Sequence, residues 1–266
     1  MTLRTDTSAP LQAFGFSFER GGAHTSRTMM LSELCTLLAS VEEQHASKAD
    51  YLEAIQTANC LGKRSGKTRL LTYRHLVDLY GLDPNFVLFR ALRFFWGRDE
   101  AGQPLLAVLC AFARDPILRS TASFILKATF GTVVTRDAVE TLIDQQEPGR
   151  FSPATLKSTA QNINASWTQA GLLNGRARKV RSHPTATAGA VAYALLLGYV
   201  SGHRGEHIFS SEYIALLDCS QEQALTLAED ASRRGWIVLK RIGQVIEVQF
   251  PALLTTEDLE HLREQN

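Results

Sequence analysis

The stretch 210–250 constrains the fold most, because its pattern changes from helical to strand periodicity within one short segment. A short apolar helix is predicted over 211–217, and Ser220 is a suitable N-cap for a second helix. Two runs rich in β-branched and aromatic residues follow at 236–239 and 245–250, with a Gly-containing turn between them, which is typical of a hairpin. This order predicts a winged-helix unit. It does not decide the partner, because winged helices bind both nucleic acids and proteins.

Proline-containing helix starts recur through the first half of the chain. Asp83-Pro84 offers an N-cap followed by a proline in the first turn, and Gln103-Pro104 and Asp115-Pro116 repeat this start. The run 85–96 is apolar on almost every side, which predicts a central helix of the core. The composition, 45% hydrophobic and 21% charged residues, is that of a globular protein. We therefore predict a mainly α fold: a helical N-terminal bundle followed by a helix–turn–helix or winged-helix-like C-terminal half with small β-hairpins.

Pro148-Gly149 is the predicted domain boundary. It divides the chain into an all-helical N-terminal domain (residues 1–149) and a winged-helix-like C-terminal domain (residues 150–266). A chain of 266 residues is long enough for two such domains, each with a hydrophobic core.

A second helix–hairpin pattern follows this boundary. Ser152-Pro153 starts a long helix that Gly171 ends, and Asn174-Gly175 is the strongest two-residue signal for a hairpin turn. The basic run 176–181 comes next. A strand there would be basic on both faces and could not be buried, so we expect an exposed wing or arm.

No motif of enzyme or metal chemistry is complete. The run 62–68 resembles a phosphate-binding loop, but three residues separate its first glycine from Gly-Lys-Thr, where the motif needs four. His203 and His207 flank Glu206, yet a zinc-protease helix needs the glutamate next to the first histidine, and nearby glycines disfavour a helix. The cysteines share no ligand spacing. We expect no metal, no cofactor and no catalytic residues, and predict that the protein is not an enzyme.

The sequence contains no signal for a membrane or for export. It starts with polar residues, and its longest apolar run, 190–200, is about half of the length that spans a bilayer. The scattered cysteines favour a reducing compartment. We expect a cytoplasmic protein without membrane contact.

Local basic clusters are the positive functional signal, because a net charge of +1 gives no bulk attraction to polyanions. The region 152–181 combines amide side chains, which can read base edges, with cations that neutralise phosphates. The second helix of the 210–250 unit carries carboxylates instead, which disfavours phosphate contact. The predicted DNA-binding residues are Lys63, Arg64, Lys67, Arg69, Arg74, Lys157, Gln161, Asn162, Arg176, Arg178, Lys179, Arg181, Lys240 and Arg241.

Short motifs spread over residues 14–200 follow the pattern of a known family. They are Phe16-Ser17-Phe18-Glu19-Arg20-Gly21-Gly22-Ala23, then Ala58-Asn59-Cys60-Leu61-Gly62-Lys63-Arg64, and Ser152-Pro153-Ala154-Thr155 opening a helix that ends in Ala170-Gly171-Leu172-Leu173. On these motifs the chain resembles the BrxA family, a small component of BREX bacteriophage-exclusion systems. The resemblance implies an all-helical, two-domain, non-enzymatic protein with helix–turn–helix character. It also implies binding to double-stranded DNA and work beside a methyltransferase, an ATPase and a phosphatase-like protein.

Three functions stay open at this point. The first is a DNA-binding accessory protein of phage defence, with DNA contact through 152–181 and an auxiliary phosphate contact at Lys240-Arg241. The second is a protein-interaction scaffold whose acidic 210–250 unit docks onto other components of the defence complex. The third is a winged-helix transcription regulator, which needs a dimer and a palindromic site. We favour the first; the sequence leaves the oligomeric state and the DNA site open.

Overall fold

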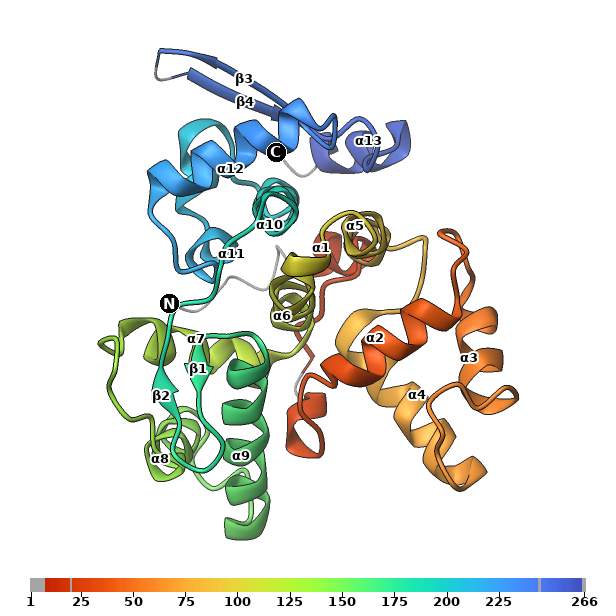
Figure 1. Cartoon of the computed structure of the whole chain (residues 1–266), viewed down its shortest axis with the longest axis vertical. Coiled ribbons are helices and arrows are strands. Elements are labelled where there is room, and N and C mark those ends of the chain that lie inside the picture. The colour runs from red at the N-terminus through yellow and green to blue at the C-terminus, as the bar shows by residue number, and fades with distance from the viewer. Residues whose placement is uncertain (1–7, 20, 244, 265–266) are drawn as a thin grey trace.

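The computed structural model describes residues 8–19, 21–243 and 245–264. These residues are mainly helical, and the two hairpins among them lie in the C-terminal half, so the predicted fold class is confirmed (Figure 1). The helices of the first half are α1 (Ser8–Ala13), α2 (Leu31–Ser40), α3 (Lys48–Gln56), α4 (Gly66–Tyr80), α5 (Val87–Trp96), α6 (Gln103–Arg114), α7 (Pro116–Lys127) and α8 (Arg136–Gln146). The second half contains α9 (Pro153–Gln169), β1 (Leu173–Asn174), β2 (Val180–Arg181), α10 (Ala188–Val200), α11 (Glu212–Ala215), α12 (Gln221–Arg233), β3 (Val238–Ile242), β4 (Val245–Gln249) and α13 (Thr256–Glu264). Short 3-10 helices are η1 (Ala23–Thr25), η2 (Glu100–Gly102) and η3 (Gly205–Ser210).

Helices α5, α6 and α10 lie at the centre of the molecule (Figure 1). α10 consists mostly of small and aliphatic residues with two tyrosines, and nearly all of its residues are buried. The carboxylate of Asp99 accepts from the amide of Gly189 at 2.8 Å, and a Cβ at Gly189 would lie 2.5 Å from that carboxylate. Tyr193 donates to the carbonyl of Leu88 at 2.9 Å, which joins α10 to α5. Although α10 is strongly apolar, no helix in the described part of the chain is long and apolar enough to cross a membrane.

Two winged-helix-like units follow one another along the chain. The first consists of α7, α8, α9 and the antiparallel hairpin β1–β2, and Val133 adds a bridge to Val180 beside β2. The second consists of α10, α11, α12 and the antiparallel hairpin β3–β4. The hairpin predicted within 210–250 is therefore confirmed. Its strands extend further toward the turn than predicted, because Lys240 and Arg241 pair with β4 instead of lying in the loop.

The first unit draws on both sides of the predicted boundary at Pro148-Gly149. α8 precedes that boundary and α9 follows it, yet the two helices pack against each other. The bridge between Val133 and Val180 also joins the two sides. Buried residues of both halves belong to one continuous hydrophobic cluster.

Candidate nucleic-acid interface

α9 is fixed to the protein along its buried face. Ser152 caps its N-terminus, as the sequence predicts. Trp167 is fully buried, and its indole donates to the Thr121 hydroxyl of α7 at 3.0 Å. The outward face stays accessible, with Lys157 and Gln161 exposed one turn apart.

A buried histidine clamps α9 to the N-terminal loop. His24 places Nδ1 2.8 Å from Asp115 Oδ2 and Nε2 2.9 Å from Ser166 Oγ. Ser166 Oγ also accepts from the amide of Met29 at 2.8 Å. The hydrogen bonds connect Ser166, His24 and Asp115 in the same way as the catalytic triad of a hydrolase. All three side chains are buried, with Ser166 and His24 fully inaccessible, so we interpret the group as a structural clamp.

The hairpin β1–β2 carries a basic loop next to the C-terminal end of α9. The strand pairing leaves 175–179 as the loop, so it is longer than the two-residue turn that Asn174-Gly175 predicts. Gly175 has a φ of 100°, and a Cβ there would lie 2.1 Å from the carbonyl oxygen of Arg178, so the loop requires glycine. We call the loop 175–179 the first wing.

A groove of about 600 Å³ lies between the first wing, α9 and the N-terminal end of α8. We call it the wing groove. It brings together four of the predicted residues, and Lys157 lies one turn further along the exposed face of α9. The lining residues are Val133, Val134, Thr135, Arg136, Gln161, Asn164, Ala165, Arg176, Ala177, Arg178 and Lys179.

The first wing supplies the positive charge of this groove. Arg176 and Arg178 are exposed, and Lys179 is half-buried. Lys179 Nζ donates to the carbonyl of Gly175 at 2.7 Å, and burial lowers the pKa of Lys179. Within the described chain, none of the three cations forms an ion pair with a carboxylate. Unpaired cations on a concave surface favour a polyanion.

The N-terminal end of α8 forms the opposite side of the groove. Thr135 caps the helix by accepting from the amide of Ala138 at 3.1 Å. Arg136 pairs with Asp137 at 2.7 Å and with Glu140 at 2.6 Å, and the hydrogen bond to Asp137 raises the pKa of Arg136. Sequence reasoning missed Arg136, because a single cation followed by two acids at the start of a helix gives no basic signal.

Asn164 is a buried polar residue in the lining of the wing groove. Its side chain is only 4% exposed, and its Oδ1 has no hydrogen-bond partner among the described atoms. A buried acceptor without a donor costs about 1–3 kcal/mol. The exocyclic amine of a nucleobase in the groove could satisfy it if the side chains around Oδ1 shifted, because this oxygen is inaccessible in the structure. Sequence reasoning missed Asn164, because its helical position adjoins the buried Ala160 and Ile163.

Arg181 is not part of an exposed wing, and that prediction is wrong. Its side chain is 2% exposed, and its guanidinium donates to the carbonyl of Ile125 at 2.9 Å and pairs with Asp218 Oδ2 at 2.7 Å. The same Asp218 oxygen lies 2.6 Å from His183 Nδ1. Asp218 comes from the turn between α11 and α12, so a carboxylate distant in sequence makes the burial of this arginine possible.

Other predicted residues are held by the protein itself. The amide of Asn162 donates to the carbonyl of His24 at 3.0 Å. Lys63 pairs with Glu33 at 3.1 Å, and Arg69 donates to two backbone carbonyls. These three side chains stabilise local structure, and we leave them out of the interface.

The remaining predicted cations lie away from the wing groove. α4 is at the lower right of Figure 1, α9 is at the lower left, and the hairpin β3–β4 is at the top. The structure therefore divides the predicted set into three separate surfaces. The predicted cations that are exposed on the other two surfaces are Arg64, Lys67, Arg74, Lys240 and Arg241.

The second winged-helix-like unit presents carboxylates where the first presents cations. Glu222 and Glu229 are exposed on α12, and Asp230 pairs with Arg233 and Arg234 on the same helix. The carboxylates on which the sequence-based prediction for α12 rests are therefore exposed, and the prediction that α12 is a poor reader of DNA stays a prediction.

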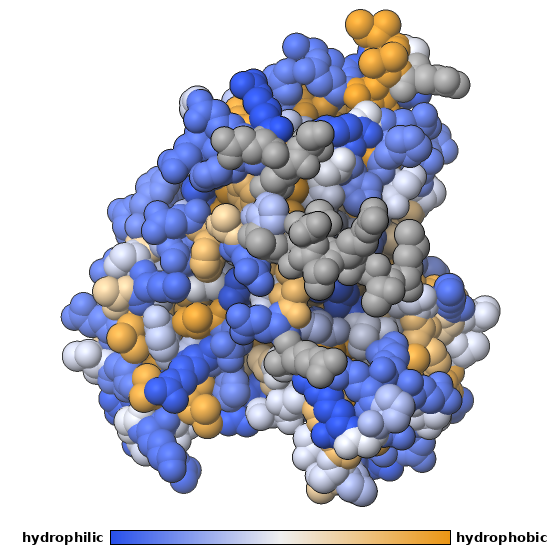
Figure 2. Space-filling model, turned by 180° about the vertical axis from the view of Figure 1, so that it is seen from behind, coloured by the Kyte–Doolittle hydropathy of each residue, from blue (hydrophilic) through white to orange (hydrophobic). Residues whose placement is uncertain are grey.

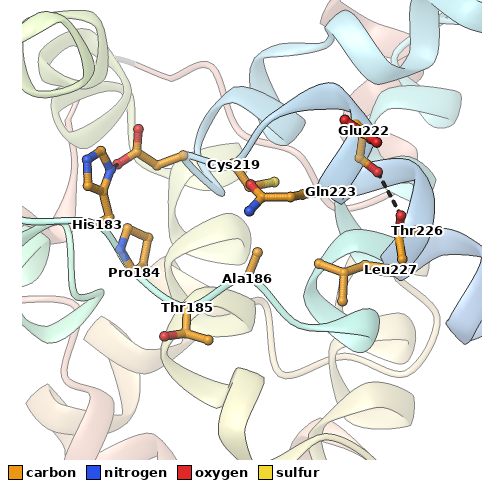
Figure 3. Close-up of a pocket in the computed structure, with 10 residues that line it drawn as sticks. His183, Pro184, Thr185, Ala186, Cys219, Glu222, Gln223, Thr226 and Leu227 are labelled. Carbon is orange, nitrogen blue, oxygen red and sulfur yellow. Dashed lines mark hydrogen bonds and ion pairs between the residues drawn. The ribbon is translucent and has the colours of Figure 1, made fainter.

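A cleft of about 760 Å³ lies beside α12, between that helix and the segment 183–186 (Figure 3). The labelled side chains of His183 and Gln223 line it, and Thr226 donates to the carbonyl of Glu222 at 3.0 Å. Asp218 and Glu222 also line the cleft. Because two carboxylates line it, the cleft disfavours phosphate, and the wing groove is the better candidate for a nucleic acid.

No protein-family model matches the sequence, and no curated protein matches it either. The functional proposal therefore rests on the geometry of the wing groove and on the resemblance of the motifs within residues 14–200 to the BrxA family. Within the described residues, no three His, Cys, Asp or Glu side chains come together as a possible metal site.

Proposed function

We propose that this chain is a non-enzymatic DNA-binding accessory protein of a BREX-type anti-phage defence system, acting in the cytoplasm. The single observation that carries the DNA-binding part is the wing groove, where unpaired cations of the first wing meet the exposed face of α9. The BREX part rests on the resemblance to the BrxA family. Its partners would be double-stranded DNA and the methyltransferase, ATPase and phosphatase-like protein of the same system.

The proposed contacts follow from the position of each side chain. Arg176 and Arg178 project from an exposed loop and would neutralise phosphates. Lys157 and Gln161 lie on the accessible face of α9, where a helix in the major groove would place them against the duplex. Most of this surface is cationic and only a few amides can read bases, so we expect weak sequence preference and strong salt dependence.

The test compares two variants that lose the same charge at different places. The first replaces Arg176, Arg178 and Lys179 with alanine, and the control replaces Arg64, Lys67 and Arg74 with alanine. Fluorescence anisotropy against a random duplex should give an affinity loss of about tenfold or more for the first variant and little change for the control. Equal losses, or no loss in the first variant, would contradict the proposed interface.

A protein-interaction scaffold is the second candidate, and one observation favours it. The exposed carboxylates Glu222 and Glu229 on α12 offer a surface that repels DNA and suits a basic protein partner. The two functions are compatible, because α9 and α12 belong to different units. Co-purification of other defence components that survives nuclease treatment and high salt would support the scaffold. Loss of every partner under those conditions would count against it.

A further inference from the structure

The hairpin β3–β4 ends in two exposed aliphatic side chains. Ile242 is 83% exposed and Val245 is 73% exposed, although both are large hydrophobic residues. The hairpin projects from the top of the molecule in Figure 1, and its tip is the orange group at the upper right of Figure 2. We call the hairpin β3–β4 the second wing. Exposed aliphatic residues at the end of a projecting hairpin indicate a contact surface rather than part of the core.

The strand register places the two side chains together. Ile242 and Val245 are directly paired across the hairpin, so their side chains share one face of it. Lys240 lies two residues before Ile242 and is on the same face, opposite Glu247. Arg241 is exposed on the other face. The tip therefore presents the apolar pair Ile242 and Val245. Behind it, Lys240 and Arg241 lie on opposite faces of β3.

The base of the second wing is anchored firmly. Val248 of β4 and Ile237, just before β3, are buried. Trp236 meets the ring of Phe95 in α5 edge-on, with ring centroids 6.1 Å apart. These contacts fix the base of the hairpin against the core, and the strands β3 and β4 extend from that base.

We propose that the second wing inserts Ile242 and Val245 into the minor groove of bound DNA and kinks the duplex there. Apolar wedges of one or two aliphatic side chains partly unstack a base step and bend DNA toward the major groove. Lys240 and Arg241 would contact the phosphates on either side of the inserted tip. The inference rests on the proposed DNA binding and adds a second contact with a mechanical effect on the DNA.

The size and charge of the tip favour DNA over a protein partner. A stable protein interface buries about 800 Å² on each side, which two side chains cannot provide. A wedge in a minor groove needs no more than such a pair. The flanking cations also match a polyanion, and Glu247, the carboxylate that faces Lys240, lies at the limit of ion pairing at 4.0 Å.

The experiment measures bending and binding on the same samples. A duplex with donor and acceptor dyes at its ends and a central TA step is titrated with the full chain, because such steps kink easily. 2-Aminopurine next to that step reports unstacking as a rise in fluorescence. The test variant carries Ile242→Ser and Val245→Ser, which should leave the fold intact because both side chains are exposed. The control is Leu71→Ser, which removes an exposed leucine from α4.

The wild-type protein and the Leu71→Ser control should both raise energy transfer between the ends and the 2-aminopurine signal. The double serine variant should still bind, with an affinity loss below about tenfold, but should produce neither signal. If the double variant bends DNA as the wild type does, or if the wild type binds without bending, the insertion is wrong while DNA binding stands. If the wild type does not bind the duplex at all, both proposals fail.

Discussion

At the scale of single residues, Arg181 shows why a basic run need not be a binding surface. Its neighbours Arg176 and Arg178 are exposed, as predicted. Arg181 points inward, because Asp218 supplies a compensating charge and backbone carbonyls accept its remaining hydrogen bonds. Sequence spacing could not reveal this pairing, since the two partners are 37 positions apart and come from different units.

Replacing Arg181 with methionine should lower the free energy of unfolding by about 3 kcal/mol. The substitution leaves the half-buried Asp218 without its arginine partner and removes the donors to several carbonyls. Urea denaturation followed by circular dichroism measures the change. The exposed Arg178→Met serves as control and should shift stability by less than about 0.5 kcal/mol. Similar effects for the two variants would contradict the assigned burial of Arg181.

The clamp around His24 makes stability depend on pH in a defined direction. Burial alone would raise the pKa of Asp115, but the attraction of His24 and hydrogen bonds from His24 and Leu118 hold that pKa below its ordinary value. A carboxyl whose folded pKa is lowered stabilises the fold above its unfolded pKa and loses that contribution as pH falls through the folded value.

The free energy of unfolding should therefore begin to fall as pH drops below about 4, the ordinary pKa of an aspartate in the unfolded chain, and should keep falling until pH passes the lower folded pKa of Asp115. Asp78 acts in the opposite sense, because burial raises its pKa. The Asp115→Asn variant isolates the first effect. It should be less stable than the wild type at neutral pH, and the difference should shrink toward pH 3. A difference that stays constant with pH would contradict the assigned role of the carboxylate.

At the scale of elements, α9 carries one amide that is bonded within the fold and another that lines the wing groove. Asn162 donates to the carbonyl of His24, whereas Asn164 leaves Oδ1 unpaired beside the wing groove. The sequence places both in a polar helix and predicts Asn162 as the DNA contact. The roles of Asn162 and Asn164 depend on which other segment of the chain packs against each turn of α9. Helical periodicity in the sequence does not predict that packing.

Alanine substitutions at these two positions should therefore have opposite effects. Asn164→Ala should weaken duplex binding severalfold while changing stability little or raising it, because it removes an unsatisfied acceptor. Asn162→Ala should lower the free energy of unfolding by about 1 kcal/mol and leave binding unchanged. Anisotropy and urea denaturation on the two purified variants measure both quantities. If Asn164→Ala binds duplex like the wild type, Asn164 is not a ligand contact.

The second wing illustrates what turn signals can and cannot predict. The Gly-containing turn and the β-branched runs are sufficient to predict the hairpin. They do not fix the strand ends, and β3 extends through Lys240 and Arg241 to Ile242. The exposure of Ile242 and Val245 also depends on how far the hairpin projects beyond the core, which only the three-dimensional structure reveals.

At the scale of the whole molecule, the sequence was sufficient to predict the fold class, but it predicted the candidate interface only in part. Helix caps and the run of apolar residues in α10 identify a helical protein with hairpins in its second half. The predicted cations are scattered over three surfaces, because each lies on a separate element and tertiary packing sets their distances (Figure 1). The predicted cations of the first wing line a groove, and they do so with help from α8.

The dependence of DNA affinity on salt tests the central claim most directly. When the first wing neutralises phosphates, the logarithm of the binding constant falls linearly with the logarithm of salt concentration, with a slope of about 0.9 for each phosphate. Alanine at Arg176, Arg178 and Lys179 should therefore reduce the slope by up to about 2.7, whereas alanine at Arg64, Lys67 and Arg74 should leave it unchanged. A slope that is the same for the wild type and the first-wing variant would contradict the wing groove as the DNA-binding site.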